Sequence, residues 1–373
     1  MNITEVFEKR QTGVTGNVKK LLDQNLPVVV VGAGNLGKKI ASFLEEKKLN
    51  FYSYTDNNPK RWGEKINDKT ILAPKEVSKD VKENAIWIVG IWSPGHSYKS
   101  TKNQLRSLGV TNIFPAAALM QLFPDDLLPH YHFQTSDYYL QHRKEIEDVY
   151  ENLSDDESKR QFLAHVDCRI NLNFEELPEA DTANQYFPSD VVVLNDSEVF
   201  LDAGAYDGDT LKDFAKRTDN EFSKYLALEP DPVNYKKLLD VARTFEDGKV
   251  EVFPYAVGAE NTVLKFDATG GAGAGFSEEG AIEVECKRVD DFFYDYKPTY
   301  LKFDIEGAEL DALKGSEKTI EMYRPKLAVC IYHLPEDLWQ IFHYLKNRFP
   351  FYNFFARTHQ YDGLDFVLYA IPE

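Results

Sequence analysis

The chain has 373 residues, of which 43% are hydrophobic and 28% are charged, the balance of a folded globular protein. This length is too great for one ordinary hydrophobic core, so we expect two domains. The formal net charge of −18 argues against nonspecific binding to nucleic acid or to an anionic membrane, because both need a basic surface.

The cysteines and the N-terminal segment bear on the compartment. Cys168, Cys286 and Cys330 lie far apart with no metal-binding spacing, so we expect reduced core thiols rather than disulfides or a zinc site. The N-terminal segment lacks an apolar core, and no run of about 18 apolar residues occurs. We therefore expect neither a signal peptide nor a membrane span, and a cytoplasmic location.

Apolar runs and amphipathic stretches alternate between residues 27 and 124, which is typical of βαβ units. The pattern predicts strands at residues 28–32, 51–56 and 85–92, and helices at residues 36–48 and 98–109.

A glycine loop, GAGNLG, follows the first predicted strand and matches the GxGxxG pattern. Asp56 ends the next strand, 22 residues after Gly34. Phosphates would bind at the helix N-terminus and a ribose at the acid. The candidate nucleotide site consists of Gly32, Gly34, Asn35, Leu36, Gly37 and Asp56. The alternative is that these glycines serve only packing.

The middle of the chain is polar, acidic and helical in pattern. Residues 144–163 contain no Gly or Pro and carry charges of both signs, which indicates a helical connector. The sequence therefore predicts a Rossmann-like domain at residues 1–125, a connector at 126–186 and a second α/β domain at 187–373.

The second α/β run predicts a series of strands and helices that ends in a hairpin. Strands are expected at residues 199–203, 224–230, 250–258, 299–307 and 326–333, and helices at 211–217, 309–322 and 337–349.

A second glycine turn, FLDAGAYDGDT, opens this run. In doubly wound sheets such a turn contacts the ligand. Asp202 and Asp207 add negative charge, so a diphosphate is disfavoured and a cation such as the sulfonium of S-adenosylmethionine is favoured. Glu229 lies 21 residues after Gly208, where it can accept both ribose hydroxyls. Dinucleotide-binding domains use an acid at the same offset.

The segments FLDAGAYDGDT, ALEPDPVNYKKL, PYAVG and LKFDIEGAELDALKGS resemble the FkbM family of S-adenosylmethionine-dependent methyltransferases, over residues 187–372. The resemblance implies a class I seven-stranded sheet with an antiparallel last strand, and methylation of a hydroxyl, commonly on a sugar or natural product. Tyr206 and Asp207 depart from the family's usual residues. The implied cofactor-binding residues are Asp202, Gly204, Tyr206, Asp207, Gly208, Thr210, Glu229, Pro230, Asp231, Tyr255, Ala256, Val257 and Asp304.

Three side chains are candidates for the chemistry. Asp304 and Glu306 follow a predicted strand and would point to opposite sides of an extended backbone. We expect Asp304 at the methyl-transfer centre and Glu306 on the acceptor side, with His333 as the alternative base. The structural alternatives are that Glu306 and Glu309 start a helix and that His333 is a core residue. Together Asp304, Glu306 and His333 could hold a divalent ion, but we expect no metal dependence.

A glycine-rich segment, residues 266–280, could form a lid whose Phe276 and Ser277 contact the acceptor, or it could be an insertion without a role.

The first α/β run, with TDNNPKRWGEKI and IVGIW, is similar to the small nucleotide-binding domain found beside sugar acyltransferases. This resemblance implies that it presents a nucleotide-linked sugar to the second domain. The sequence thus predicts two Rossmann-like domains forming an O-methyltransferase of polysaccharide biosynthesis. The alternatives are an NAD-linked oxidoreductase and a nucleotide-sugar binding protein, and the oligomeric state is not indicated.

Overall fold

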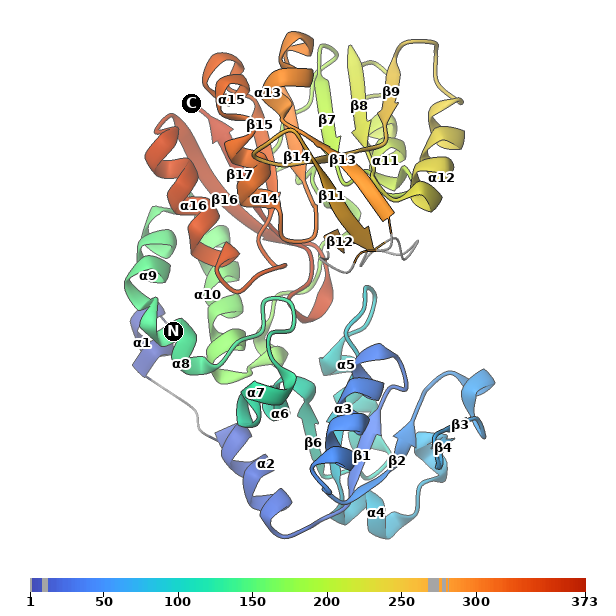
Figure 1. Ribbon diagram of the computed structural model, residues 1–373. Coiled ribbons are helices and arrows are strands. Elements are labelled where there is room, and N and C mark those ends of the chain that lie inside the picture. Colours follow the sequence, from blue (N-terminus) through green and yellow to red (C-terminus); the bar gives the residue numbers. More distant parts are fainter. Residues whose placement is uncertain (1, 9–12, 268–274, 277–279, 281) are drawn as a thin grey trace. The chain divides into compact units, whose positions relative to one another are not determined.

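The computed structural model describes residues 2–8, 13–267, 275–276, 280 and 282–373 (Figure 1). The chain divides into two compact units. The first comprises residues 1–150, 160–180 and 360–364, and the second comprises residues 151–159, 181–359 and 365–373. The two Rossmann-like folds and the helices between them confirm the predicted fold class, whereas the two boundaries between the three predicted segments stay a prediction.

The first unit is built on a six-stranded sheet in the order β3-β4-β2-β1-β5-β6. All neighbours pair in parallel except β3 and β4, which are antiparallel. β1 is buried along its whole length, as expected for a central strand covered on both faces. The strands are β1 (Val28–Val31), β2 (Phe51–Thr55), β3 (Lys65–Ile66), β4 (Lys69–Leu72), β5 (Ile86–Val89) and β6 (Asn112–Pro115).

Helices α3 and α5 follow β1 and β5, as the sequence predicts. α3 buries Ile40, Phe43 and Leu44 on one face, the helical spacing of an amphipathic helix. The helices of the N-terminal half are α1 (Ile3–Glu8), α2 (Gly13–Asp23), α3 (Asn35–Glu46), α4 (Lys79–Asn84), α5 (Tyr98–Ser107) and α6 (Ala116–Leu122).

The predicted connector is helical, and its long stretch is broken once, between α9 and α10. Its helices are α7 (Pro124–Leu127), α8 (Ser136–Gln141), α9 (Arg143–Asn152) and α10 (Asp156–Asn171).

The second unit contains a seven-stranded sheet in the order β16-β17-β15-β14-β7-β8-β9. β17 runs antiparallel to both β15 and β16, while the other pairs are parallel. This order and the antiparallel β17 confirm the predicted class I sheet and the terminal hairpin (Figure 1). The strands are β7 (Val199–Ala203), β8 (Lys224–Leu228), β9 (Val250–Phe253), β14 (Tyr300–Phe303), β15 (Lys326–Cys330), β16 (Tyr352–Thr358) and β17 (Phe366–Pro372).

A second sheet in this unit was not predicted. Residues 250–258, expected to form one strand, are divided at Pro254 because proline has no amide hydrogen to continue the ladder. The part after Pro254 becomes β10, in a four-stranded sheet ordered β10-β13-β11-β12. Its strands are β10 (Tyr255–Val257), β11 (Thr262–Asp267), β12 (Gly275–Phe276) and β13 (Ile282–Lys287). Most of the proposed lid, including Ser277, lies outside the described residues.

Helices flank the large sheet (Figure 1). The helix predicted at residues 309–322 is divided at Gly315, whose missing side chain admits the backbone oxygen of Gly258; a Cβ there would lie 2.0 Å from that oxygen. The helices are α11 (Asp209–Arg217), α12 (Pro232–Ala242), α13 (Val289–Phe292), α14 (Glu309–Lys314), α15 (Glu317–Tyr323) and α16 (Asp337–Arg348).

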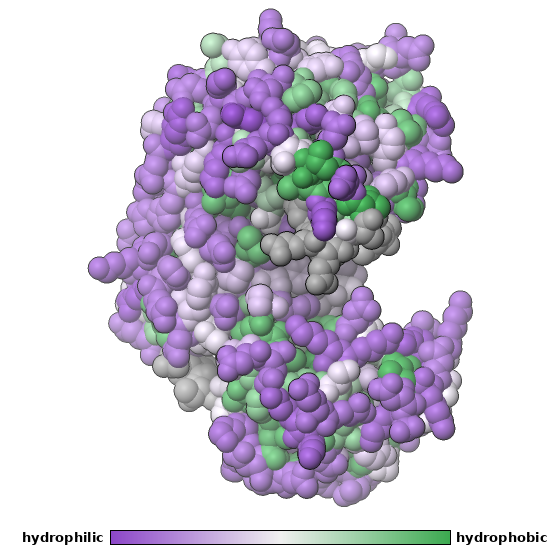
Figure 2. Space-filling model, in the orientation of Figure 1, coloured by the Kyte–Doolittle hydropathy of each residue, from purple (hydrophilic) through white to green (hydrophobic). Residues whose placement is uncertain are grey.

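The face shown in Figure 2 is mostly hydrophilic, in keeping with the charged composition. Among the described residues, no helix combines the length and apolar character needed to cross a lipid bilayer.

Candidate functional site

The glycine turn of the second unit connects β7 to α11 and contacts the residue that follows β14. Gly204 has φ +84°, and a Cβ on it would lie 1.9 Å from the backbone oxygen of Asp304, so only glycine fits. Gly208, with φ +87°, is the N-cap residue immediately before α11. Tyr206 and Asp207 between them are half-buried, and Thr210 is buried in the first turn of α11. The turn therefore lies at the sheet edge where class I folds bind their cofactor.

Asp202 does not present a free negative charge, contrary to the sequence argument. Its side chain is fully buried and accepts a hydrogen bond from Lys302 Nζ at 2.8 Å and another from the hydroxyl of Tyr225. Lys302 lies opposite Asp202 in the β14–β7 ladder. Burial alone would lower the pKa of Lys302, but Asp202 and Asp304 raise it. The Asp202–Lys302 pair was not predicted, although a lysine inside a buried strand is a sequence signal for a buried ion pair.

The carboxylate of Glu229 is fixed by two backbone hydrogen bonds, one of them from the glycine turn. Its Oε2 accepts the amide of Tyr206 at 2.9 Å and its Oε1 accepts the amide of Asp231 at 2.8 Å. Burial raises the pKa of Glu229 to about 7, against the lowering effect of those two hydrogen bonds. Each carboxylate oxygen keeps a second lone pair, so the two together can accept the hydroxyls of a ribose.

The other predicted cofactor residues have visible structural roles. Asp231 caps α12, because its Oδ1 accepts the amides of Val233 and Asn234 at 2.8 and 3.1 Å. Pro230 is half-buried beside it. Tyr255, Ala256 and Val257 form β10, where Tyr255 is half-buried and the other two are buried. Their contact with a cofactor stays a prediction.

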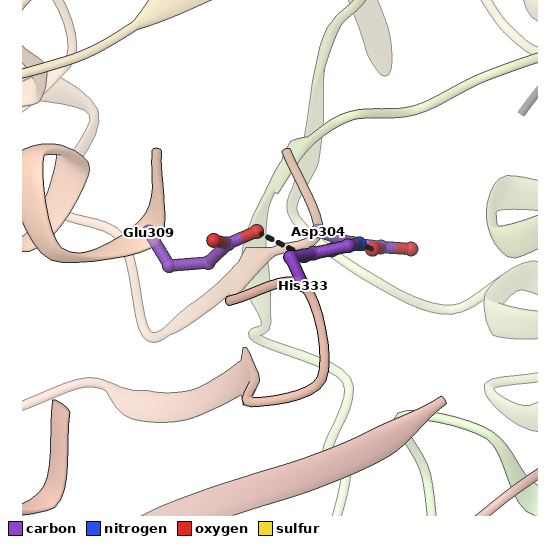
Figure 3. A group of neighbouring side chains, drawn as sticks. All are labelled: Asp304, Glu309 and His333. Atoms are coloured by element: carbon purple, nitrogen blue, oxygen red, sulfur yellow. Dashed lines mark hydrogen bonds and ion pairs between the residues drawn. The ribbon is translucent and has the colours of Figure 1, made fainter. Parts of the chain in front are cut away.

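An acid and histidine cluster lies where β14 and β15 end. His333 is buried, and its Nδ1 lies 2.9 Å from Glu309 Oε1, which also accepts the amide of Ile305 at 2.8 Å. Figure 3 shows the imidazole between the carboxylates of Glu309 and Asp304. His333 Nε2 lies 3.4 Å from Asp304 Oδ1 and 3.9 Å from Glu306 Oε1, and it makes no hydrogen bond.

Asp304 is held by two tyrosines. The hydroxyl of Tyr186 donates to its Oδ2 at 2.6 Å, and the hydroxyl of Tyr332 lies 3.4 Å from its Oδ1. Burial would raise the pKa of Asp304, but Lys302, His333 and the Tyr186 hydrogen bond lower it overall. Asp304 is therefore ionised at neutral pH. Tyr186 precedes the motifs that carry the family resemblance, and no sequence signal marked it.

The protonation states of the cluster follow from its excess of carboxylates. Burial would lower the pKa of His333, but Glu309, Asp304 and Glu306 raise it to about 10. Burial and the neighbouring acids raise the pKa of Glu306 to about 8, although His333 opposes this. Glu306 also has φ +57°, which turns the chain sharply after β14. The predicted catalytic residues Asp304, Glu306 and His333 thus lie together.

In the glycine loop of the first unit, close packing excludes a side chain at two of the three glycines. Gly32 has φ +92° and a Cβ there would lie 2.3 Å from Ile91 Cγ1, while a Cβ on Gly37 would lie 1.9 Å from the oxygen of Gly32. Gly34 differs, because its φ is −75° and a Cβ there would meet nothing within 4 Å. Packing therefore explains two of the three glycines and leaves Gly34 unexplained.

Asp56 follows β2 and contacts this glycine loop through a hydrogen bond. Its Oδ2 accepts the amide of Ala33 at 3.0 Å, and its Oδ1 accepts the amide of Asn58 at 2.9 Å. Arg61 Nη1 lies 3.5 Å from Oδ2. Leu36 is buried at the start of α3, whereas Asn35, the first residue of that helix, is exposed.

A cavity of about 300 Å³ lies next to the loop within the first unit. The indole nitrogen of Trp92, which lines it, is buried and has no hydrogen-bond partner. Asp362, from the turn of the terminal hairpin, accepts the amide of Tyr98 and bonds His96 Nδ1 at 2.9 Å. The cavity is lined by Leu36, Val89, Ile91, Trp92, Tyr98, Pro115, Ala116, Ala117, Met120, Phe133, Phe174 and Asp362.

The strand order of the large sheet and the glycine turn followed by Glu229 define the second unit as a class I methyltransferase fold. Residues 202–361 match the family model of the methyltransferase FkbM domain. Residues 202–361 therefore form a methyltransferase domain of the FkbM type, a class that uses S-adenosylmethionine in general.

One solved structure shares the fold along nearly the whole chain. It is the methyltransferase FkbM from Methylobacillus flagellatus, with a TM-score of 0.81 and 20% identity, covering 99% of this chain and 98% of that one. At this identity the likeness establishes the fold and no more.

The Rossmann-like first unit is similar to curated redox-sensing transcriptional repressors named Rex. The repressor of Caldanaerobacter subterraneus is 28% identical over 142 residues, which is 37% of this chain and 63% of that protein. The repressor of Carboxydothermus hydrogenoformans is 32% identical over 127 residues, or 31% and 61% of the two chains. The chain thus spans less than two thirds of these relatives.

Proposed function

We propose that the protein transfers a methyl group from S-adenosylmethionine to a hydroxyl of a sugar, a nucleotide-linked sugar or a related glycan or natural-product precursor. The observation that carries this proposal is the position of the acid and histidine cluster. It follows β14 and β15, at the same edge of the class I sheet as the glycine turn and Glu229. A cofactor at the turn would thus have its reactive end beside the ionised carboxylate of Asp304 and the two titratable groups next to it.

The residues of the glycine turn fit the cofactor. Gly204 and Gly208 have positive φ and pack closely against Asp304 and α12, which fixes the path of the turn at the sheet edge, and Glu229 has the free lone pairs that ribose hydroxyls require. Asp207 and Asp209 lie beside the N-terminus of α11, where their charges disfavour a phosphate. The Asp202–Lys302 pair contributes no net charge and supports the backbone of Gly204, whose oxygen accepts from Lys302 Nζ at 2.8 Å.

S-adenosylmethionine, when bound, supplies a methyl carbon activated by a positively charged sulfur. A bond forms from the acceptor oxygen to this carbon as the carbon–sulfur bond breaks, with its electron pair remaining on sulfur. The chain aligns the acceptor and receives the hydroxyl proton. We assign that proton to Asp304, the ionised member of the cluster that also contains Glu306 and His333, and from this cluster the proton passes to water.

The test combines binding and turnover. Calorimetry of the full chain is expected to show binding of S-adenosylmethionine and S-adenosylhomocysteine, and Glu229→Ala is expected to weaken both. Transfer of label from methyl-labelled S-adenosylmethionine to a panel of sugars and nucleotide sugars then identifies the acceptor class. Absence of S-adenosylhomocysteine binding by the folded protein contradicts the cofactor assignment. Labelling of amines but of no hydroxyl contradicts the acceptor assignment.

We infer a second binding function for the first unit, that of holding a nucleoside diphosphate group. The carrying observation is Gly34, which lies at the N-terminus of α3 with open space where a side chain would be. In GxGxxG loops the middle glycine lets a pyrophosphate approach the backbone. Asp56 is placed for the ribose, and the similarity to Rex repressors supports a nucleotide. The group could belong to a nucleotide-linked sugar or to NAD.

These two sources are separated by titrating the full chain with UDP-sugars and, in parallel, with NAD⁺ and NADH. Binding of a UDP-sugar supports a domain that presents the acceptor, and binding of NAD⁺ or NADH supports a dinucleotide site. Failure of every nucleoside diphosphate to bind, while S-adenosylhomocysteine still binds, contradicts the second inference alone.

A further inference from the structure

The acid and histidine cluster contains a buried nitrogen atom, His333 Nε2, that has no hydrogen-bond partner. His333 is only 3% exposed, and its Nε2 makes no hydrogen bond. A buried polar atom without a partner is costly and unusual. Two carboxylate oxygens lie near it, Asp304 Oδ1 at 3.4 Å and Glu306 Oε1 at 3.9 Å. The arrangement thus leaves a position between one nitrogen and two carboxylates.

The spacing of these atoms is that of ligands on one metal ion. Nitrogen and oxygen ligands lie about 2.0 to 2.2 Å from ions such as Zn²⁺, so two ligands of one ion are about 3 to 4 Å apart at usual bond angles. The two separations of 3.4 and 3.9 Å fall in this interval. A third carboxylate adjoins this position, because donor atoms of Asp304, Glu309 and His333 also lie within 4.8 Å of one another.

Glu309 has a different function from the other two acids. Its Oε1 is occupied by His333 Nδ1 at 2.9 Å and by the amide of Ile305 (Figure 3). This hydrogen bond keeps a proton on Nδ1, so a metal ion that displaces the proton on Nε2 would be bound on the side of the ring that faces Asp304 and Glu306. Metal-binding histidines commonly have such a carboxylate behind them. Glu309 is therefore a positioning residue.

The charges around the imidazole also favour a cation. Five carboxylates act on His333 and its neighbours. They come from the turn after β14, the first residues of α14 and α16 and the residue before β17, and belong to Asp304, Glu306, Glu309, Asp337 and Asp365. The cation that opposes them is Lys302, on the far side of Asp304, where it is paired with Asp202. A divalent cation bound at Nε2 in place of its proton would reduce the mutual repulsion of these carboxylates.

We propose that His333 Nε2, Asp304 and Glu306 bind a divalent transition-metal ion of the Mn²⁺ type. An imidazole combined with carboxylates suits such an ion better than Ca²⁺ or Mg²⁺. The side chains of Asp304 and Glu306 are 22% and 25% exposed, so the ion is reachable and keeps coordination positions for another ligand. Resting on the proposed function, that ligand is the acceptor hydroxyl, which the ion holds in place for methyl transfer.

Metal binding is tested on the full chain after treatment with EDTA and dialysis. Electron paramagnetic resonance of free Mn²⁺ is expected to show one bound ion per chain, with Mg²⁺ and Ca²⁺ competing at least tenfold less well. His333→Gln and Asp304→Asn are each expected to weaken Mn²⁺ binding at least tenfold, and Glu309→Gln about tenfold. Asp365→Asn is the matched control, because it removes a nearby negative charge but no ligand, and its effect should stay below threefold.

Calorimetry with S-adenosylhomocysteine shows whether each variant is folded. In the unmutated protein, Mn²⁺ should broaden the nuclear resonances of the His333 ring, which tests the site without any substitution. The inference is overturned if no stoichiometric Mn²⁺ binds, or if Asp365→Asn weakens binding as much as His333→Gln does. Mn²⁺ binding without S-adenosylhomocysteine binding would retain the metal site and reject the methyltransferase proposal, and the reverse result would do the opposite.

Discussion

The two glycine loops of the molecule use the same hydrogen-bonding arrangement. In the first unit Asp56 accepts the amides of Ala33 and Asn58, and in the second unit Glu229 accepts the amides of Tyr206 and Asp231. In both cases the acid ends the second strand and holds the turn that follows the first. The acid at this offset is therefore explained by the scaffold itself, and it does not by itself indicate which ligand binds.

The charges distinguish the two loops. At the equivalent ladder position the first unit pairs Val30 with Ile88, whereas the second pairs Asp202 with Lys302. Asn35 and Leu36 begin the helix of the first unit, but Asp209 begins that of the second. The first helix start can receive a phosphate and the second repels one. Ligand choice thus follows from a few charged positions on a shared backbone.

The largest effect on stability is expected when Lys302, the partner of Asp202 in the second unit, is replaced by an apolar residue like Ile88 at the equivalent position of the first unit. Lys302→Met leaves Asp202 buried and without its cation, which should lower the free energy of unfolding by about 3 to 5 kcal/mol. Chemical denaturation measures this. Ile88→Met at the equivalent position of the first unit is the matched control and should cost less than about 1.5 kcal/mol. If Asp202→Asn added to Lys302→Met recovers no stability, the unpaired carboxylate is not the cause.

The sheets were predictable because their parallel strands are apolar runs separated by amphipathic helices. The small sheet was not, because Pro254 divides one apolar run between two sheets, and local pattern does not show where the second part pairs. In the site, Asp304, Glu306 and His333 were found from their positions at strand ends. The Glu309 hydrogen bond to His333 depends on how α14 meets the end of β15, which spacing alone does not determine.

The second prediction concerns the acid and histidine cluster, which has no counterpart among the described residues of the first unit. Asp304→Asn should slow methyl transfer about 100-fold, because it removes a charge beside the acceptor hydroxyl. The dissociation constant of S-adenosylhomocysteine should change less than about threefold, because the turn and Glu229 are untouched. Initial rates and calorimetry on the same preparation measure the two effects. Unchanged turnover would remove Asp304 from the centre.

The third prediction uses the raised pKa of Glu229. Ribose hydroxyls bind the ionised carboxylate, so affinity for S-adenosylmethionine should rise about tenfold between pH 6 and pH 8, around the pKa of about 7. The stability of the ligand-free protein should depend on pH in the opposite direction. The folded state holds this proton more tightly than the unfolded state, so the free energy of unfolding falls as pH rises from about 4.5 to about 7.

Glu229→Gln should remove both pH dependences while keeping the shape of the side chain. Asp231 and Lys302 are the charged groups that act on Glu229, so the ladder pair must be intact in the variants compared. Calorimetry and denaturation across this pH interval provide the measurements. A pH dependence that persists in Glu229→Gln belongs to another group.

The smallest effect on stability is expected at Gly34, and it separates the roles of the glycines in the first loop. Gly34→Ala should change the free energy of unfolding by less than about 0.5 kcal/mol, because its backbone angles suit alanine and the added methyl meets nothing. It should nevertheless weaken binding of a nucleoside diphosphate about tenfold, since the methyl occupies the space of the pyrophosphate. Gly32→Ala should instead destabilise the fold, because Ile91 and a φ of +92° both exclude a side chain. If Gly34→Ala binds nucleotides as tightly as the unmutated protein, the open space at this glycine is not the phosphate site, and the two loops share a scaffold without sharing a binding function.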